Sequence, residues 1–162
     1  MTANAPVTPR TPIAHIHVWT EEEINAFETR WPRGTIQRTA FDLMLHAAIR
    51  PHDARHLLWA NIHDNGITLR QRKTGHRLTV GVPPDLARSL SQEAVNKGAY
   101  VLSDARGQPY SSTGFHQFMR RAFEAARLPK HCSPYGLRKA AVRRMLEAGF
   151  DIDQIRHPRT RL

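Results

Sequence analysis

The sequence predicts a mainly α-helical domain with a small antiparallel three-stranded sheet, an α+β fold. Two observations lead to this prediction. Several segments place apolar residues at three- and four-residue spacing, and between Ala60 and Val82 this period changes to alternation interrupted by Gly-containing turns. A third observation limits the size: 162 residues suffice for one sizeable hydrophobic core but not for two comfortable domains.

The first helices are predicted from capping residues and periodicity. Thr20–Glu23 fits a capping box, in which the Thr hydroxyl and the Glu carboxylate satisfy each other's backbone donors, so a helix should run to about Arg30. Residues 31–34 break it. The second helix carries a set of small and large apolar residues: Ile36, Ala40, Leu43, Met44, Ala47 and Ala48. Pro51 suits a first helical turn and predicts a third helix, Pro51–Trp59.

Three short strands are predicted next. Asp64–Gly66 separates Ile62 from a strand over residues 67–72, because Asn and Gly tolerate the positive φ that hairpin turns need. Lys73–Gly75 makes the second turn, and His76–Val82 alternates as the third strand. The three strands should form one antiparallel sheet.

Three more helices complete the expected fold. Their predicted limits are Pro83 to before Gly98, Ser111 or Ser112 to Leu128, and about Tyr135 to Glu147 with Gly149 as a left-handed stop. A short extended piece, Tyr100–Ser103, lies between the first two, and Asp151 should cap a last turn through Ile155.

Charge and cysteine content narrow the function classes. The 24 Lys and Arg exceed the 14 Asp and Glu by 10, and such an excess favours a polyanionic partner, most often nucleic acid. Cys132 is the single cysteine, so no intrachain disulfide forms and a reducing, cytoplasmic compartment is expected, at the nucleoid if the protein binds DNA. The absence of any long apolar run argues against a membrane span.

Three basic positions lie at the ends of predicted elements. Arg50 is expected to end the second helix, Lys73 to sit at a hairpin tip, and Arg138 to begin the last long helix. Each alone is typical of a solvated surface. Together, two Arg and a mobile Lys can grip one phosphate from several sides, which is the arrangement that phosphoryl transfer needs.

In order and context these motifs resemble the catalytic domain of tyrosine site-specific recombinases, the phage integrase family. The resemblance rests on Ala48–Asp53, Gln71–Gly75, and Tyr135–Ala141 followed by Ala148 and Gly149, and it extends from about Trp19 to Ile155. It divides the chain into a flexible leader, residues 1–18, a catalytic-domain-like core, residues 19–155, and a basic tail, residues 156–162.

The resemblance implies a DNA partner and a role for each basic residue. Arg50 and Arg138 would bind the phosphate, Asp53 would support Arg50, and Lys73 would donate a proton to the leaving 5′ oxygen. The family reaction is attack of a Tyr phenolate on a DNA phosphodiester, which gives a covalent 3′-phosphotyrosine. It needs neither metal nor nucleotide, as is usual for covalent catalysis.

The chain departs from the family pattern at two places. Tyr135 occupies the position of a His, and a phenol with a pKa near 10 is a poor general base at neutral pH. The family's later Gly-His pair and nucleophilic Tyr have no counterpart before Leu162, and neither Tyr100 nor Tyr110 is a good substitute. The chain, which also has no room for the family's helical clamp domain, is therefore expected not to cleave DNA alone.

Alternatives remain open. The chain is either a recombinase domain for DNA recombination and integration, truncated or complemented by another copy or a full-length recombinase, or a non-catalytic DNA-binding regulator, or a protein-interaction remnant. Two His pairs, His15/His17 and His52/His56, invite a metal interpretation, but no Cys or carboxylate set completes a zinc spacing, so no metal or cofactor is expected. Cys132, next to His131, is expected to be a structural thiol.

Overall fold

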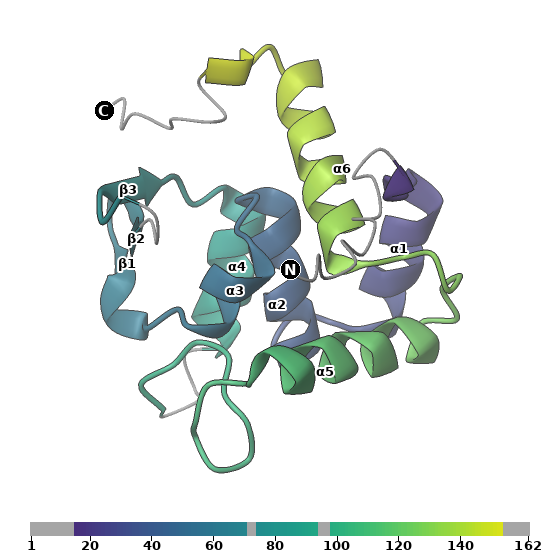
Figure 1. Cartoon of the computed structure of the whole chain (residues 1–162), viewed down its shortest axis with the longest axis horizontal. Helices are drawn as coiled ribbons and strands as arrows, with labels where there is room; N and C mark the ends of the chain where they lie inside the picture. The colour runs from purple at the N-terminus through teal and green to yellow at the C-terminus, as the bar shows by residue number, and fades with distance from the viewer. Residues whose placement is uncertain (1–14, 71–73, 94–97, 154–162) are drawn as a thin grey trace, which may run out of the picture.

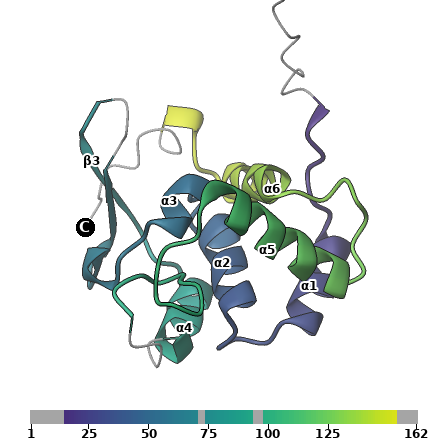
Figure 2. The same cartoon turned by 60° about the horizontal axis from the view of Figure 1, so that its bottom comes forward.

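In a computed structural model of the chain, residues 15–70, 74–93 and 98–153 are described. Helices surround a central helix, and a three-stranded sheet lies at one end of this helical body (Figures 1 and 2). The helices are α1 Glu21–Arg30, α2 Ile36–His46, α3 Pro51–Arg55, α4 Pro84–Glu93, α5 Ser112–Ala125 and α6 Pro134–Glu147. The predicted fold class, mainly α with a small antiparallel sheet, is confirmed. No described helix has the length and apolar character that crossing a bilayer would require.

The start of α1 is the predicted capping box. The Glu23 amide donates to Thr20 Oγ1 at 3.2 Å, and the Thr20 amide donates to Glu23 Oε2 at 2.9 Å. Each side chain therefore satisfies a backbone donor that the helix start leaves without a partner. As predicted, α1 ends at Arg30, just before Trp31 and Pro32.

Helix α2 is the centre of the core. Its residues from Arg38 to Leu45 are all buried, and it packs against both α4 and α6. The buried face contains an ion pair: Arg38 Nε donates to the fully buried Asp42 carboxylate at 3.0 Å. Ser89 of α4 also donates to Asp42. Removing one partner of such a buried pair costs more free energy than the pair itself contributes. The hydrogen bond from Ser89 to the Asp42 carboxylate holds α4 against α2.

The second and third helices differ from their predicted limits. α2 ends at His46 rather than at Arg50, which is instead the N-cap residue of α3, so the predicted end of the second helix is wrong. α3 stops at Arg55 instead of Trp59 and is followed by a 3₁₀ turn, Trp59–Asn61. The reason is tertiary: the amides of Trp59 and Val101 donate to the carbonyls of Ala99 and Leu57. These bonds hold the chain extended where the helix was predicted to continue.

The sheet has the order β1-β2-β3 with both pairs antiparallel. Its strands are β1 Ile62–His63, β2 Gly66–Arg70 and β3 Arg77–Val80, and the register pairs Ile67 with Val80 and Arg70 with Arg77. Gly66 has φ +138, and a Cβ there would lie 2.4 Å from the Val80 carbonyl oxygen. The predicted hairpin glycine is therefore required by both its conformation and its contact.

The last two long helices begin at serine caps. Ser111 Oγ accepts from the Gly114 amide at 3.0 Å, and Ser133 Oγ accepts from the Gly136 amide at 3.1 Å. The predicted cap of α5 is thereby confirmed, and α6 begins at Pro134, one residue before its predicted start. Gly149 has φ +91 and provides the expected left-handed stop.

The segment preceding α1 lies against the first turn of α6. Trp19 is fully buried among Phe27, Phe41 and Phe123, and its indole Nε1 donates to the Ser133 carbonyl at 2.9 Å. The His17 carbonyl lies directly over Gly136. Of the predicted leader, Ile16 and His17 therefore contact the body of the molecule, while residues 1–14 lie outside the described part.

A methyl group at position 136 tests this contact. An added Cβ would lie 2.0 Å from the His17 backbone oxygen and 3.2 Å from the Trp19 ring. Gly136→Ala is expected to lower the free energy of unfolding by about 1–3 kcal/mol, as overpacking usually does. Gly81→Ala, where the Cβ meets nothing within 4 Å, should change it by less than about 0.5 kcal/mol. Urea unfolding measures both; equal stability of the two variants would contradict the close packing.

A second contact joins α1 to α6 and predicts a pH dependence. Glu21 accepts from Arg144 Nη2 at 2.6 Å and from Arg143 Nη2 at 2.9 Å. The hydrogen bond from Arg144, against a smaller effect of burial, lowers the pKa of Glu21. Because this carboxylate has a lower pKa in the folded chain, it stabilises the fold above its unfolded pKa, and the contribution disappears as the pH falls through the folded value.

Glu21→Gln should therefore be less stable than the native chain near pH 7 and equally stable in acid. Glu21 is largely exposed, so screening limits the expected loss at pH 7 to under about 1 kcal/mol. Urea unfolding at several pH values measures it, with the exposed neighbour Glu22 changed to Gln as the control. A stability difference that stays constant down to pH 2 would contradict the ion pair.

Candidate functional site

The site is built around the turn between α2 and α3. Ala48 has φ +51, an uncommon conformation for a residue with a Cβ, and it turns the chain between the two helices. Its carbonyl oxygen accepts from Nε of Arg138 at 2.8 Å. Since Arg50 is only two residues further on, this single bond brings the start of α6 to the start of α3. The two predicted phosphate-binding arginines therefore share one region.

Arg50 and Arg138 influence each other electrostatically. Burial, followed by repulsion from Arg50, lowers the pKa of Arg138, and Asp53 acts in the opposite direction. Arg50 itself is exposed. Within the described part of the chain, neither the Arg50 guanidinium nor the Nη groups of Arg138 have a hydrogen-bonded partner. Guanidinium groups carry the charge and the donors that suit an anion such as phosphate.

Asp53 and Tyr135 lie at the edge of the same region. Both contribute to the electrostatic environment of Arg138, but Asp53 forms no ion pair with Arg50 among the described side chains. Tyr135 is 59% exposed and stands three residues before Arg138, so the two residues share a face of α6.

Lys73 lies outside the described residues, so the structure gives no position for it. The strands that precede and follow it are described, and they carry Arg70 and Arg77 directly opposite each other, both exposed. Like charges in directly opposed positions destabilise a sheet unless an anion neutralises them. A cleft beside these residues, lined also by His63 and Asn61, has a volume of about 390 Å³.

The structure adds two residues that sequence reasoning did not select, Arg55 and His116, and places them beside His52. His52, Arg55 and His116 line a pocket of about 130 Å³ beside Tyr135. Arg55 Nη1 donates to the Tyr110 carbonyl at 2.9 Å, which ties α3 to the loop before α5. His116 lies more than sixty residues from α3 in the sequence, so no local pattern connects it with this pocket.

The His52/His56 pair shares a face of α3, as its spacing indicated. The ring centroids are 4.5 Å apart, but the Arg55 guanidinium lies 3.1 Å from Nδ1 of His52. A permanent cation against a ring nitrogen opposes metal binding at the same atom.

The three tyrosines occupy different environments. Tyr100 is half-buried, and its backbone pairs with Leu58 in an isolated antiparallel bridge. Tyr110 is stacked on Phe118 with ring centroids 4.9 Å apart, and burial, with a smaller effect of Asp104, raises the pKa of its phenol. A raised pKa makes a phenol a weaker nucleophile at neutral pH. Tyr135 alone is exposed, next to Arg138.

The sequence of the chain matches the model of a known protein family. Residues 19–158 match the model of the phage integrase family. No curated protein matches the sequence. The matched span contains Arg50, Asp53, Lys73, Tyr135 and Arg138.

Solved structures share the fold. The lambda integrase catalytic core superposes with a TM-score of 0.69 at 18% identity, over 83% of this chain and 85% of that one. XerA recombinase gives a TM-score of 0.77 at 16% identity, over 91% of this chain and 58% of that one. A lambda integrase dimer bound to a COC′ core site gives 0.70 at 19%, over 85% and 56%. This chain thus spans a little over half of these two longer proteins.

Proposed function

The chain belongs to the phage integrase family, and we propose that it binds DNA by holding one backbone phosphate between Arg50, Arg138 and Lys73. The observation that carries the proposal is the hydrogen bond from Arg138 Nε to the Ala48 carbonyl, which orients one guanidinium beside the other. The formal charge of +10 supports a polyanionic partner. A similar fold is found in a lambda integrase dimer bound to a DNA core site.

Each residue has a distinct part in this proposal. The Ala48 carbonyl uses the Nε–H of Arg138, so the Nη groups are directed to the phosphate oxygens, while Arg50 binds from the start of α3. Asp53 supports Arg50, and Tyr135 donates a further hydrogen bond to the phosphate. Lys73 would donate a proton to the leaving oxygen wherever strand cleavage occurs.

We further propose that these 162 residues do not cleave DNA by themselves. Tyr135 lies on the same face of α6 as Arg138, where it contacts the phosphate rather than attacking it in line with the leaving oxygen. Tyr100 and Tyr110 are held in packing contacts. A different polypeptide, such as a full-length recombinase, would supply the nucleophile. The division into residues 1–18, 19–155 and 156–162 remains part of this proposal.

One observation favours the interaction alternative as a second candidate. Three large apolar side chains at and beyond the end of α6 are exposed: Leu146 at 43%, Phe150 at 53% and Ile152 at 51%. Neighbouring exposed apolar residues mark protein contact surfaces. A non-catalytic role, as a DNA-binding regulator or a protein-interaction domain, would use this surface.

The phosphate grip is tested by DNA binding at several salt concentrations. Arg50→Ala and Arg138→Ala should each weaken binding about tenfold or more, because a hydrogen bond to a charged group contributes about 1.5–3 kcal/mol. Each should also reduce the slope of log affinity against log salt by about 1. Fluorescence anisotropy with a labelled duplex measures both quantities, and circular dichroism confirms folding.

The matched control is Arg121→Ala, which removes the same charge from an exposed position of α5. It should weaken binding much less than the two site variants. Equal losses of DNA affinity in all three variants would mean that only the net charge matters and that the proposed phosphate contacts of Arg50 and Arg138 are wrong. Negligible DNA affinity of the native chain at low salt would leave the protein-interaction alternative.

The absence of cleavage is tested with nicked suicide duplexes of randomised sequence. The chain should form no covalent adduct that survives denaturation in detergent, whereas an active tyrosine recombinase on its own site forms one under the same conditions. An adduct that appears with the native chain and disappears in Tyr135→Phe would identify Tyr135 as a nucleophile and refute the proposal. Tyr135→Phe should otherwise weaken DNA binding only a few-fold, as the loss of one hydrogen bond does.

A further inference from the structure

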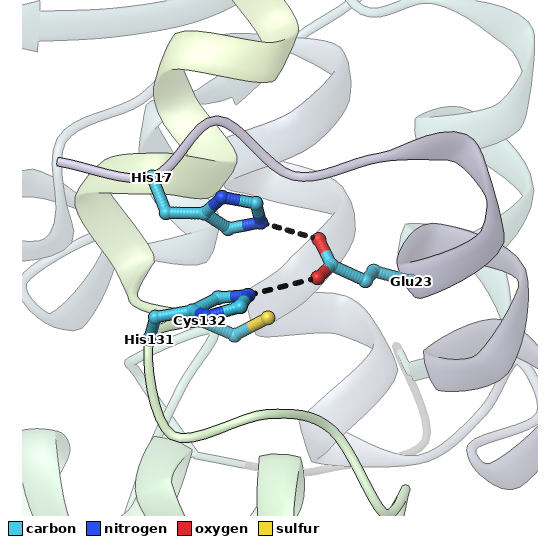
Figure 3. A group of neighbouring side chains, drawn as sticks. All are labelled: His17, Glu23, His131 and Cys132. Atoms are coloured by element: carbon cyan, nitrogen blue, oxygen red, sulfur yellow. Dashed lines mark hydrogen bonds and ion pairs between the residues drawn. The ribbon is translucent and has the colours of Figure 1, made fainter.

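Four side chains with metal-binding atoms converge away from the phosphate site. His17 comes from the segment before α1, Glu23 from the first turn of α1, and His131 and Cys132 from the loop between α5 and α6. Each offers one ligand atom, and the four atoms all lie within 4.8 Å of one another. Figure 3 shows the two imidazoles and the thiol pointing toward the Glu23 carboxylate.

The separations within this group are short. His17 Nε2 lies 2.8 Å from Glu23 Oε2, and His131 Nε2 lies 3.2 Å from Glu23 Oε1 (Figure 3). The two imidazole centroids are 4.0 Å apart. Ligand atoms of a tetrahedral zinc ion are roughly 3.3–3.8 Å apart, given Zn–N near 2.1 Å and Zn–S near 2.3 Å. Small side-chain rotations bring the present distances to that range.

We propose that His17, Glu23, His131 and Cys132 form a structural zinc site. The set combines the three ligand types that zinc prefers, imidazole nitrogen, thiolate sulfur and carboxylate oxygen, in the number that a closed structural site needs. A thiolate and a carboxylate together carry two negative charges, which neutralise Zn²⁺ beside two neutral imidazoles. A neutral site is compatible with Cys132, which is completely buried.

Zinc binding requires a balanced change of protons. The Cys132 thiol gives up its proton to solvent as the Zn–S bond forms. Each imidazole releases the Nε2 proton that it donates to Glu23 and takes one up on Nδ1, so that the neutral ring binds zinc through Nε2. Glu23 is already ionised, because hydrogen bonds from His17, Thr20 and His131 outweigh its burial and hold its pKa at about 2. Without a metal ion, burial, with a contribution from Glu23, raises the pKa of Cys132 to about 12.

A second group with metal-binding atoms does not support the same conclusion. Glu28, Asp42 and His46 are also close together, but the Arg38 guanidinium bonds Asp42 at 3.0 Å and Glu28 at 3.1 Å. This guanidinium occupies the position of a cation and already neutralises the carboxylates. Around His17, Glu23, His131 and Cys132, the described contacts include no Lys or Arg ion pair with Glu23.

The position of the site indicates what zinc would do. Ser133, the N-cap of α6, directly follows Cys132 and accepts the Trp19 indole hydrogen bond. Zinc would therefore join the segment before α1, α1 itself and the start of α6 at one point. Since Arg138 lies five residues after Ser133, the ion would fix the helix that carries it. Zinc binding here does not require that the chain bind DNA.

Metal binding by the purified full chain tests the proposal. After removal of metal with a chelator, the chain should bind one equivalent of zinc, measured by competition with a chromophoric chelator. Co²⁺ in place of zinc should give the visible spectrum of tetrahedral coordination and a thiolate-to-cobalt charge-transfer band. Thermal unfolding of the native chain should shift to higher temperature as zinc is added.

Variants distinguish zinc binding at this site from zinc binding by other histidines of the chain. His131→Ala and Cys132→Ser should each weaken zinc binding at least about tenfold, and Cys132→Ser should remove the charge-transfer band. His131 has a side chain 55% exposed, so His131→Ala should fold even if the buried Cys132→Ser variant does not. The double variant His52→Ala/His56→Ala is the control and should bind like the native chain. Failure to bind one equivalent, a cobalt complex without the charge-transfer band, or unchanged binding in His131→Ala would overturn the proposal.

Discussion

The hydrogen bond between Arg138 Nε and the Ala48 carbonyl connects the two parts of the molecule that carry the proposed phosphate-binding residues. It joins the first turns of α6 to the turn between α2 and α3, and that turn depends on the left-handed conformation of Ala48. A non-glycine residue in this conformation costs about 1–2 kcal/mol, which the surrounding packing has to offset. This one backbone carbonyl therefore links helix α6 both to the core helix α2 and to Arg50.

Helix α6 is held from its other side by the N-terminal segment. Trp19 fills the aromatic core and bonds Ser133, the His17 carbonyl lies over Gly136, and Glu21 pairs with Arg143 and Arg144. These contacts all restrict the same helix, so the orientation of Arg138 depends on residues more than a hundred positions away in the sequence. The proposed zinc site lies where this segment meets the start of α6.

Local sequence rules predicted the elements well where local interactions decide. The capping box at Thr20, the serine cap of α5 and the glycine stop after α6 all occur where the pattern placed them. The end of α2 was misplaced because Ala48 turns the chain in a left-handed conformation. The end of α3 was misplaced because the Trp59 amide donates to the Ala99 carbonyl and the Val101 amide donates to the Leu57 carbonyl. Propensity and periodicity contain no information about a partner strand forty residues away.

The sequence by itself determined the fold class, the family resemblance and the identity of the basic residues proposed to bind phosphate, because short motifs and charge are local properties. Only the tertiary structure decided that Arg50 caps α3 beside Arg138, and that His52, Arg55 and His116 line one pocket. It also placed His17 and Glu23 beside His131 and Cys132. No regular zinc spacing reveals that group, since chain folding closes a separation of more than a hundred residues.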